Sequence, residues 1–139
     1  MSEKTNFIQT TGFMHVRELE PAVVFFRDLL GFTPHIHARD YAYLEREGCG
    51  IRIWAHPAHE GERLGNRSFR YYFDVRDVDA LYAELKPKLD LLPTGDVHGP
   101  ADKHYGQREL LILAPDGDLV CFGQAIFKMP DPYPPAARD

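Results

Sequence analysis

Cysteine and tryptophan are scarce in this chain of 139 residues, which has two Cys and a single Trp. Two cysteines, at positions 49 and 121, are too few and too far apart to indicate a disulfide framework or a zinc motif. No run approaches the roughly 18 apolar residues that a membrane-spanning helix needs. The first residues lack the charged-then-apolar pattern of a secretory signal, so a cytoplasmic location is expected, with no membrane partner.

Basic residues are also in deficit, since 16 Lys and Arg stand against 21 Asp and Glu, giving a net charge of −5. A chain of this sign repels phosphate backbones, so no nucleic-acid partner is expected. The same charge is compatible with a cationic ligand. A hydrophobic content of 44% and a charged content of 27% are typical of a soluble globular domain.

Two segments have the apolar spacing of amphipathic helices. The first spans 21–30, where Pro21 suits the first helical position and Gly31 suits the left-handed residue that ends a helix. The second spans 78–86, where Asp77 is the predicted N-cap and Pro87 the predicted end.

The other apolar segments have the composition of strands separated by turns. Strands are predicted at 7–16, 33–40, 41–47, 49–56, 68–75, 108–114 and 119–125, and turn signals lie at 39–40, 47–48 and 116–117. The polar stretch 57–67 is a predicted linker, the stretch near 91–97 is predicted to be rich in loops, and the proline-rich tail 128–139 is predicted to be extended or frayed.

The two halves of the chain repeat each other. The letters VREL at 16–19 and VRDV at 75–78 each end a predicted strand and begin a predicted helix. Each half reads strand, helix and three further strands, and such a repeat takes precedence over single motifs. We therefore predict one α+β domain over 1–139, built from two tandem βαβββ modules at 8–56 and 68–127, with cupped mixed sheets that enclose a cavity.

Three stretches also resemble a known group of proteins. VRELEPAVVFFRDLLGF, FDVRDVDALYAELK and YGQRELLILAPDGDLVCFG are similar to the vicinal oxygen chelate superfamily, and within it to the glyoxalase/bleomycin resistance protein/dioxygenase family. The resemblance covers residues 10–125 and implies the same duplicated fold. It does not fix an activity, because the superfamily includes metal lyases, ring-cleaving dioxygenases and metal-free antibiotic-binding proteins.

The resemblance also implies where a catalytic metal would be bound in such enzymes, by His, Gln or Glu side chains on the open sheet face. In this chain the matching positions are Thr11, Arg70 and Cys121, with Arg52 or Trp54 as the fourth. None is a good ligand for a hard divalent cation, and an arginine places a fixed positive charge at the site. We therefore predict no metal, no cofactor and no catalytic residue of the metal-dependent type.

Histidines elsewhere offer weaker alternatives. The stretch HPAHE at 56–60 has ligand-like residues, but its proline and glycine surroundings favour a solvated loop. Alternation places His35 and His37 on one face of a strand, where an exposed or groove-lining pair is favoured over a metal site. His15 shares a face with Thr11 and Phe13, which favours a hydrogen-bonded wall residue of the cavity.

Strand alternation predicts an open face that is aromatic and charged. The apolar set of the 68–75 strand, which is Phe69, Tyr71, Phe73 and Val75, is expected to pack under the second helix. The resemblance adds Tyr105, followed by Gly106, as the border of a ligand groove. The predicted ligand-binding residues are Tyr41, Tyr43, Arg52, Trp54, Arg70, Tyr72, Tyr105, Gln107 and Cys121.

Aromatic rings with a few polar groups suit a planar or amphipathic ligand. We therefore predict a metal-free protein that binds and sequesters a small molecule, such as a cationic glycopeptide antibiotic of the bleomycin type. The resemblance implies a homodimer with grooves at the interface and exchanged N-terminal arms. The alternative is a metal-dependent lyase or dioxygenase, or a metal-free enzyme in which Arg70 activates Cys121 as a nucleophile. A buried, inert cysteine is favoured over that nucleophile.

Overall fold

The computed structural model of the chain describes residues 5–56 and 69–126. The predicted linker 57–67 and the predicted tail 128–139 lie outside these ranges. The elements, in chain order, are β1 (Gly12–Val16), α1 (Leu19–Val24), η1 (Phe25–Leu29), β2 (Thr33–His37), β3 (Tyr41–Arg46), β4 (Cys49–Ala55), β5 (Arg70–Asp74), α2 (Val78–Leu89), β6 (Val97–Asp102), β7 (Gln107–Leu113) and β8 (Leu119–Ala125).

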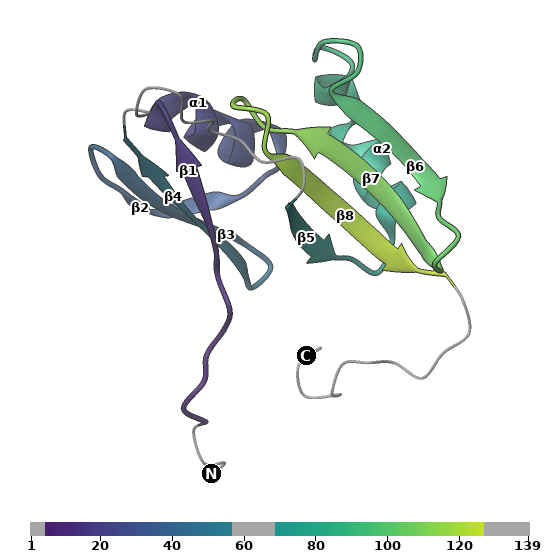
Figure 1. Cartoon of the computed structure of the whole chain (residues 1–139), viewed down its shortest axis with the longest axis horizontal. Coiled ribbons are helices and arrows are strands. Elements are labelled where there is room, and N and C mark those ends of the chain that lie inside the picture. Colours follow the sequence, from purple (N-terminus) through teal and green to yellow (C-terminus); the bar gives the residue numbers. More distant parts are fainter. Residues whose placement is uncertain (1–4, 57–68, 127–139) are drawn as a thin grey trace.

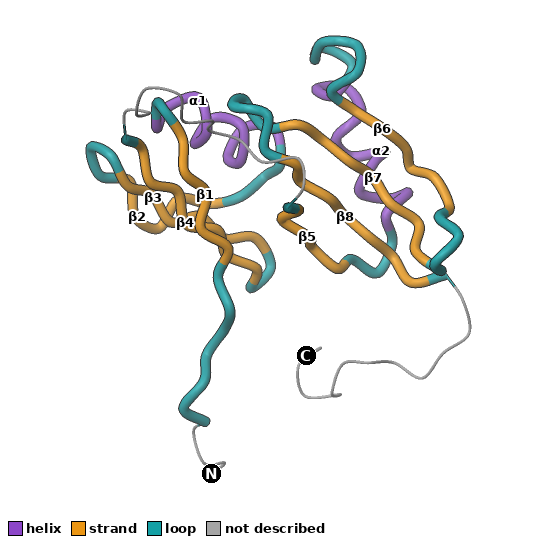
Figure 2. The backbone as a smooth tube through the Cα atoms, viewed as in Figure 1, coloured by secondary structure: helices purple, strands orange, loops and turns teal. Residues whose placement is uncertain are grey.

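Each half of the chain forms a four-stranded mixed sheet, and Figure 1 shows the two sheets side by side. The strand orders are β1-β4-β3-β2 and β5-β8-β7-β6. In both sheets the first and last strands of the half pair in parallel, and the other pairs are antiparallel. The prediction of two tandem βαβββ modules is confirmed. Figure 2 shows that strands make up most of the fold. Among the described residues, no helix is long and apolar enough to cross a membrane.

The first helix begins earlier than predicted and contains an unpredicted π-helical turn. It begins at Leu19, so that Pro21 is its third residue and not its first. Proline is tolerated there because amide groups in the first turn of a helix have no partner within the helix. The helix continues as a π-helix, η1, which brings the rings of Phe25 and Phe26 into the core. Gly31 has φ +78° and ends the helix as predicted.

The second helix begins as predicted and ends later. The side chain of Asp77 accepts a hydrogen bond from the amide of Ala80 at 3.0 Å, which confirms the N-cap. The predicted end at Pro87 is wrong, because the helix continues to Leu89. Leu85 and Leu89 lie one turn apart and are both buried, so burial of Leu89 stabilises the last turn despite the missing proline donor.

The repeat implied a third strand after the second helix without locating it, and this strand, β6, completes the second sheet. Its register with β7 shifts between His98 and Ala101, where Gly99 and Pro100 interrupt the ladder. A Cβ atom on Gly99 would lie 2.3 Å from the carbonyl oxygen of Glu109, so the strand needs glycine to approach β7.

Two face predictions from alternation are corrected. A register shift between Pro34 and Ile36 separates His35 from His37. His35 Nε2 lies 3.5 Å from Glu45 Oε1, whereas His37 Nε2 lies 2.8 Å from Glu20 Oε2 beside α1, so the two rings do not share a face. Phe69 is 55% exposed and does not pack under α2, since it lies just before β5 begins.

Contacts from several elements join the two modules. The rings of Phe32 and Phe73 meet edge to face at 5.5 Å in the core. At the surface the Arg46 guanidinium donates to both carboxylate oxygens of Glu84, at 2.9 and 2.8 Å. The hydroxyl of Tyr71 donates to the carbonyl of Phe13 at 3.1 Å and links the edge strands β5 and β1.

Candidate functional site

The open face of the second sheet is centred on a buried carboxylate, that of Glu109 on β7. Its side chain is 1% exposed, and it is the one glutamate among the buried residues of the described ranges. The register places Glu109 opposite Gly123 on the face that also carries Tyr72 and Cys121. Glu109 was not among the predicted site residues.

Three predicted site residues converge on that carboxylate. The hydroxyl of Tyr105 donates to Oε1 at 2.7 Å, and Nη1 of Arg70 donates to the same oxygen at 3.1 Å. The hydroxyl of Tyr72 lies 3.0 Å from Oε2 and 3.1 Å from the amide oxygen of Gln107. The structure thus brings Arg70, Tyr72, Tyr105 and Gln107 into one network, which satisfies the buried charge.

This network sets the protonation of the groups around it. Burial, followed by the hydrogen bond to Glu109, raises the pKa of the Tyr72 hydroxyl above its usual value, so it remains a donor at neutral pH. Arg70 is 42% exposed, and its partner carboxylate is almost fully buried. Arg70 therefore sits at the surface of the network, where its guanidinium is open to solvent and to a ligand.

Cys121 lies on the predicted face but has no exposed surface. Burial, and then the charge of Glu109, raises the pKa of its thiol to about 12, against the smaller opposing effect of Arg70. The nucleophile hypothesis is wrong, because the thiol is neutral and covered at neutral pH. For the same reason Cys121 is corrected from a ligand contact to part of the floor beneath the network.

Glycines on the central strands allow two tyrosine rings to lie across the sheets. A Cβ atom on Gly123 would lie 1.8 Å from the hydroxyl oxygen of Tyr72. A Cβ atom on Gly50 would lie 2.4 Å from the hydroxyl oxygen of Tyr43 in the first sheet. Each tyrosine therefore takes its position over a glycine, where a larger residue would displace the ring.

The open face of the first sheet holds the other predicted residues. Nη1 of Arg52 donates to the hydroxyl of Tyr41 at 2.5 Å, and its guanidinium carbon lies 4.9 Å from the centre of the Tyr43 ring. Trp54 shares this face and is 42% exposed. No hydrogen bond, ion pair or ring contact of the described residues joins this cluster to the Glu109 network.

The residues at the metal-ligand positions of the superfamily do not fit a divalent cation. Thr11 offers only a hydroxyl, Arg70 is a cation paired with Glu109, and Cys121 is a buried neutral thiol. Within residues 5–56 and 69–126 no group of three or more His, Cys, Asp or Glu side chains is arranged to hold a metal ion. No step through a metal at those positions follows from this arrangement.

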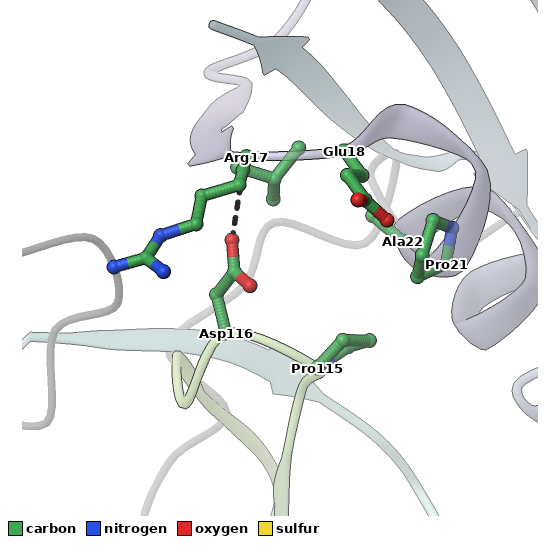
Figure 3. Close-up of a pocket in the computed structure, with 7 residues that line it drawn as sticks. Arg17, Glu18, Pro21, Ala22, Pro115 and Asp116 are labelled. Carbon is green, nitrogen blue, oxygen red and sulfur yellow. Dashed lines mark hydrogen bonds between the residues drawn. The ribbon is translucent and has the colours of Figure 1, made fainter. Parts of the chain in front are cut away.

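A pocket of about 260 Å³ lies away from both clusters, where the start of α1 meets the turn between β7 and β8 (Figure 3). Asp116 crosses it and accepts a hydrogen bond from the backbone amide of Arg17 at 2.9 Å. None of the predicted site residues lines this pocket. The pocket therefore lies at the interface between the two modules, where the predicted turn at 116–117 contacts the start of α1.

Known proteins with similar sequences and structures were found for this chain. No protein-family model matches the chain. A bleomycin resistance protein of Geobacillus stearothermophilus is 26% identical over 133 residues, which cover 86% of this chain and 98% of that protein.

Two solved structures match over similar lengths. A bleomycin resistance determinant encoded on transposon Tn5 has a TM-score of 0.70 at 21% identity, covering 86% of this chain and 98% of that one. A bleomycin-binding protein from bleomycin-producing Streptomyces verticillus, complexed with copper(II)-bleomycin, has a TM-score of 0.67 at 20% identity, covering 90% of this chain and all of that one. The resemblance predicted from the sequence is therefore confirmed, and the chain has the fold of the bleomycin resistance proteins and of the glyoxalase/bleomycin resistance protein/dioxygenase group.

Proposed function

We propose that this protein binds and sequesters a small aromatic, cationic molecule of the bleomycin glycopeptide type without changing it chemically. The observation that carries the proposal is the buried Glu109 carboxylate, ringed by Tyr72, Tyr105 and Arg70 on an open sheet face. Such a site offers hydrogen bonds and aromatic faces. It does not offer a nucleophile, because the nearby thiol is neutral.

Relatives support the choice of ligand. The relative from Geobacillus stearothermophilus is a bleomycin resistance protein, and a solved protein of the same fold is complexed with copper(II)-bleomycin. The net charge of −5 favours a cation. Exposed rings of Trp54 and Tyr105 would stack on planar groups of the ligand, and tyrosine faces attract positive charge.

The residues that we propose to contact the ligand belong to both sheets. In the first sheet they are Tyr41, Tyr43, Arg52 and Trp54, and in the second they are Arg70, Tyr72, Tyr105 and Gln107. Both cysteines are free thiols in the structure, which suits a reducing compartment such as the cytoplasm.

Ligand binding is tested by titrating the full chain with copper-free and copper-loaded bleomycin. We expect a dissociation constant in the micromolar range or below, with a change in the emission of Trp54, the single tryptophan. Loss of one stacking ring in Trp54→Ala should weaken binding by about tenfold. Tyr82→Ala, on α2 outside the proposed site, is the matched control and should bind normally. Unchanged emission, no heat of binding and no shift in melting temperature would rule out this ligand class.

The N-terminal arm supports a second part of the proposal, that two copies of the chain form a dimer. In Figure 1 the segment before β1 extends away from the first sheet. Phe7 and Ile8 on this arm are 92% and 93% exposed. Large apolar side chains at such exposure favour a partner surface, and a second copy of the chain would also cover the open faces and deepen the groove.

We expect sedimentation equilibrium to give twice the chain mass of 15.9 kDa, that is 31.8 kDa. The double variant Phe7→Asp with Ile8→Asp places two charges on the arm. It should shift the equilibrium to the monomer, because burying unpaired carboxylates at the dimer interface is costly. Leu91→Asp, at an 83% exposed position on a different loop, is the control and should remain dimeric. A monomeric parent chain at micromolar concentration would contradict the dimer.

A further inference from the structure

Two histidines lie side by side at one end of the first sheet, outside the clusters described above. His15 is near the end of β1, and His56 directly follows β4. Nδ1 of His15 lies 3.0 Å from Nε2 of His56, and the two rings are nearly perpendicular at 89°. The backbone amide of His56 donates to the carbonyl of Val16 at 2.9 Å, which extends the parallel pairing and holds the second ring beside the first.

This pair occupies a different place from the metal positions of the superfamily. His15 lies four residues after Thr11 on the same strand face, and His56 lies four residues after Arg52 on the matching face. The imidazoles are therefore displaced by about 13 Å along the strands from the positions where the superfamily enzymes hold their metal. From the sequence His15 was expected on the cavity wall and His56 at the end of the 49–56 strand, beside a solvated loop, and the two were not paired.

The spacing of the two nitrogens suits a single metal ion. Bonds of about 2.0–2.1 Å from a metal to two imidazole nitrogens at a right angle place those nitrogens about 2.9 Å apart. The observed separation is 3.0 Å. Both residues retain access to solvent, since His15 is exposed and His56 is partly exposed. In the metal-free structure the two nitrogens share a hydrogen bond, so an ion would replace the shared proton and both rings would turn until their lone pairs meet at the ion.

The chemistry of the donors selects the class of ion. Imidazole nitrogens suit Cu²⁺, Zn²⁺ and Ni²⁺ and do not suit Mg²⁺ or Ca²⁺, and Cu²⁺ binds most strongly in this series. With an ion bound, each neutral ring would keep its proton on the outer nitrogen, His15 on Nε2 and His56 on Nδ1. Trp54 lies against both rings, at 5.3 Å from His15 and 4.4 Å from His56, and leaves one side of the site apolar and flat.

We propose that His15 and His56 form a two-histidine site for a divalent ion of the copper class, whose remaining positions are filled by water or by a chelating small molecule. Two protein ligands leave at least two positions open, so the site accepts either the hydrated ion or a metal already held by a planar chelator. Stacking on Trp54 favours the planar chelator. The proposal goes beyond the binding function above and does not depend on it.

The test uses the tag-free full chain with Cu²⁺ alone in one arm and with copper(II) bipyridine, a planar chelate with two free neighbouring positions, in the other. We expect one copper per chain, with electron paramagnetic resonance showing two imidazole nitrogens and with quenching of Trp54 emission. His15→Phe and His56→Phe keep the ring contacts but remove the ligand nitrogen. Each should weaken copper binding by at least about tenfold and remove the two-nitrogen signal. His98→Phe is the control and should bind as the parent does, because the ring of His98 lies on β6 in the other sheet, with its Nε2 2.8 Å from the carbonyl oxygen of Gly95.

The outcomes separate the sources of the metal. Binding in both arms that depends on both histidines supports the site, and binding in one arm alone supports it and identifies the hydrated ion or the chelate as the occupant. Copper binding that survives His15→Phe, or no binding in either arm, overturns the proposal. A failure to bind bleomycin has no bearing on this result, because neither probe contains it.

Discussion

Replacing Arg70 by alanine is expected to lower the free energy of unfolding by about 2 kcal/mol, because it leaves a buried carboxylate with one fewer charged partner. Glu109 is 1% exposed, so it cannot recover the lost interaction from water. The reverse change is milder, since removal of Glu109 leaves Arg70, which is 42% exposed and can be hydrated. Urea denaturation of the two variants measures this asymmetry.

Arg108, an arginine on strand β7 of the same sheet, provides the matched control. Arg108 donates to Asp79 and to Asp102, whose side chains are 60% and 64% exposed. Because both partners stay hydrated, Arg108→Ala should cost only about 0.5 kcal/mol. Adding Glu109→Gln to Arg70→Ala should restore part of the lost stability, since the uncompensated charge is then removed. Equal losses for Arg70→Ala and Arg108→Ala would show that the buried carboxylate does not depend on its arginine.

Replacing Gly123 by alanine is expected to weaken glycopeptide binding by at least about tenfold, because it moves one aromatic ring of the proposed site. The new Cβ would lie only 1.8 Å from the hydroxyl oxygen of Tyr72, which is too close for both atoms to keep their positions. The ring must then swing outward, which breaks its contacts with Glu109 and Gln107. Calorimetric titration measures the affinity, and thermal melting shows whether the fold persists.

Two further variants assign the cause. Tyr72→Phe keeps the ring and removes the hydroxyl, so a small loss of affinity there together with a large loss in Gly123→Ala indicates that the ring position matters. Gly50→Ala makes the corresponding change in the first sheet, where a Cβ would lie 2.4 Å from the hydroxyl of Tyr43. Normal affinity in Gly123→Ala would remove Tyr72 from the site.

Much of the fold could be predicted because repetition and alternation are written in the sequence. The paired VREL and VRDV stretches gave the two modules, and Asp77 and Gly31 were recognised from local rules that act within one turn. Pro87 misled the prediction, since the penalty of a proline is local but the burial of Leu89 is a tertiary effect. Strand β6 was not located because Gly99 and Pro100 disfavour a strand until β7 is beside it.

The candidate site was predicted less completely. Alternation placed Arg70, Tyr72 and Cys121 on the correct face, but the number of residues along a strand does not give depth. Cys121 was therefore expected both as a ligand contact and as a buried, inert thiol, and only the second expectation agrees with its full burial. Glu109 had a usable signal, because it lies two residues after Gln107 on the same strand and therefore on the same face. The His15–His56 pair had none, since the parallel register of β1 and β4 decides which residues are neighbours.

The strand order has a consequence for how the protein is made. In each sheet the strand synthesised last lies second from the edge, so that β4 separates β1 from β3 and β8 separates β5 from β7. On the ribosome β1 has no ladder partner until the residues of β4 have emerged, whereas the hairpin of β2 and β3 can pair before then. We therefore expect the first sheet to be completed only once about 56 residues are free of the exit tunnel, and the second sheet to be completed in the same way once β8 has emerged.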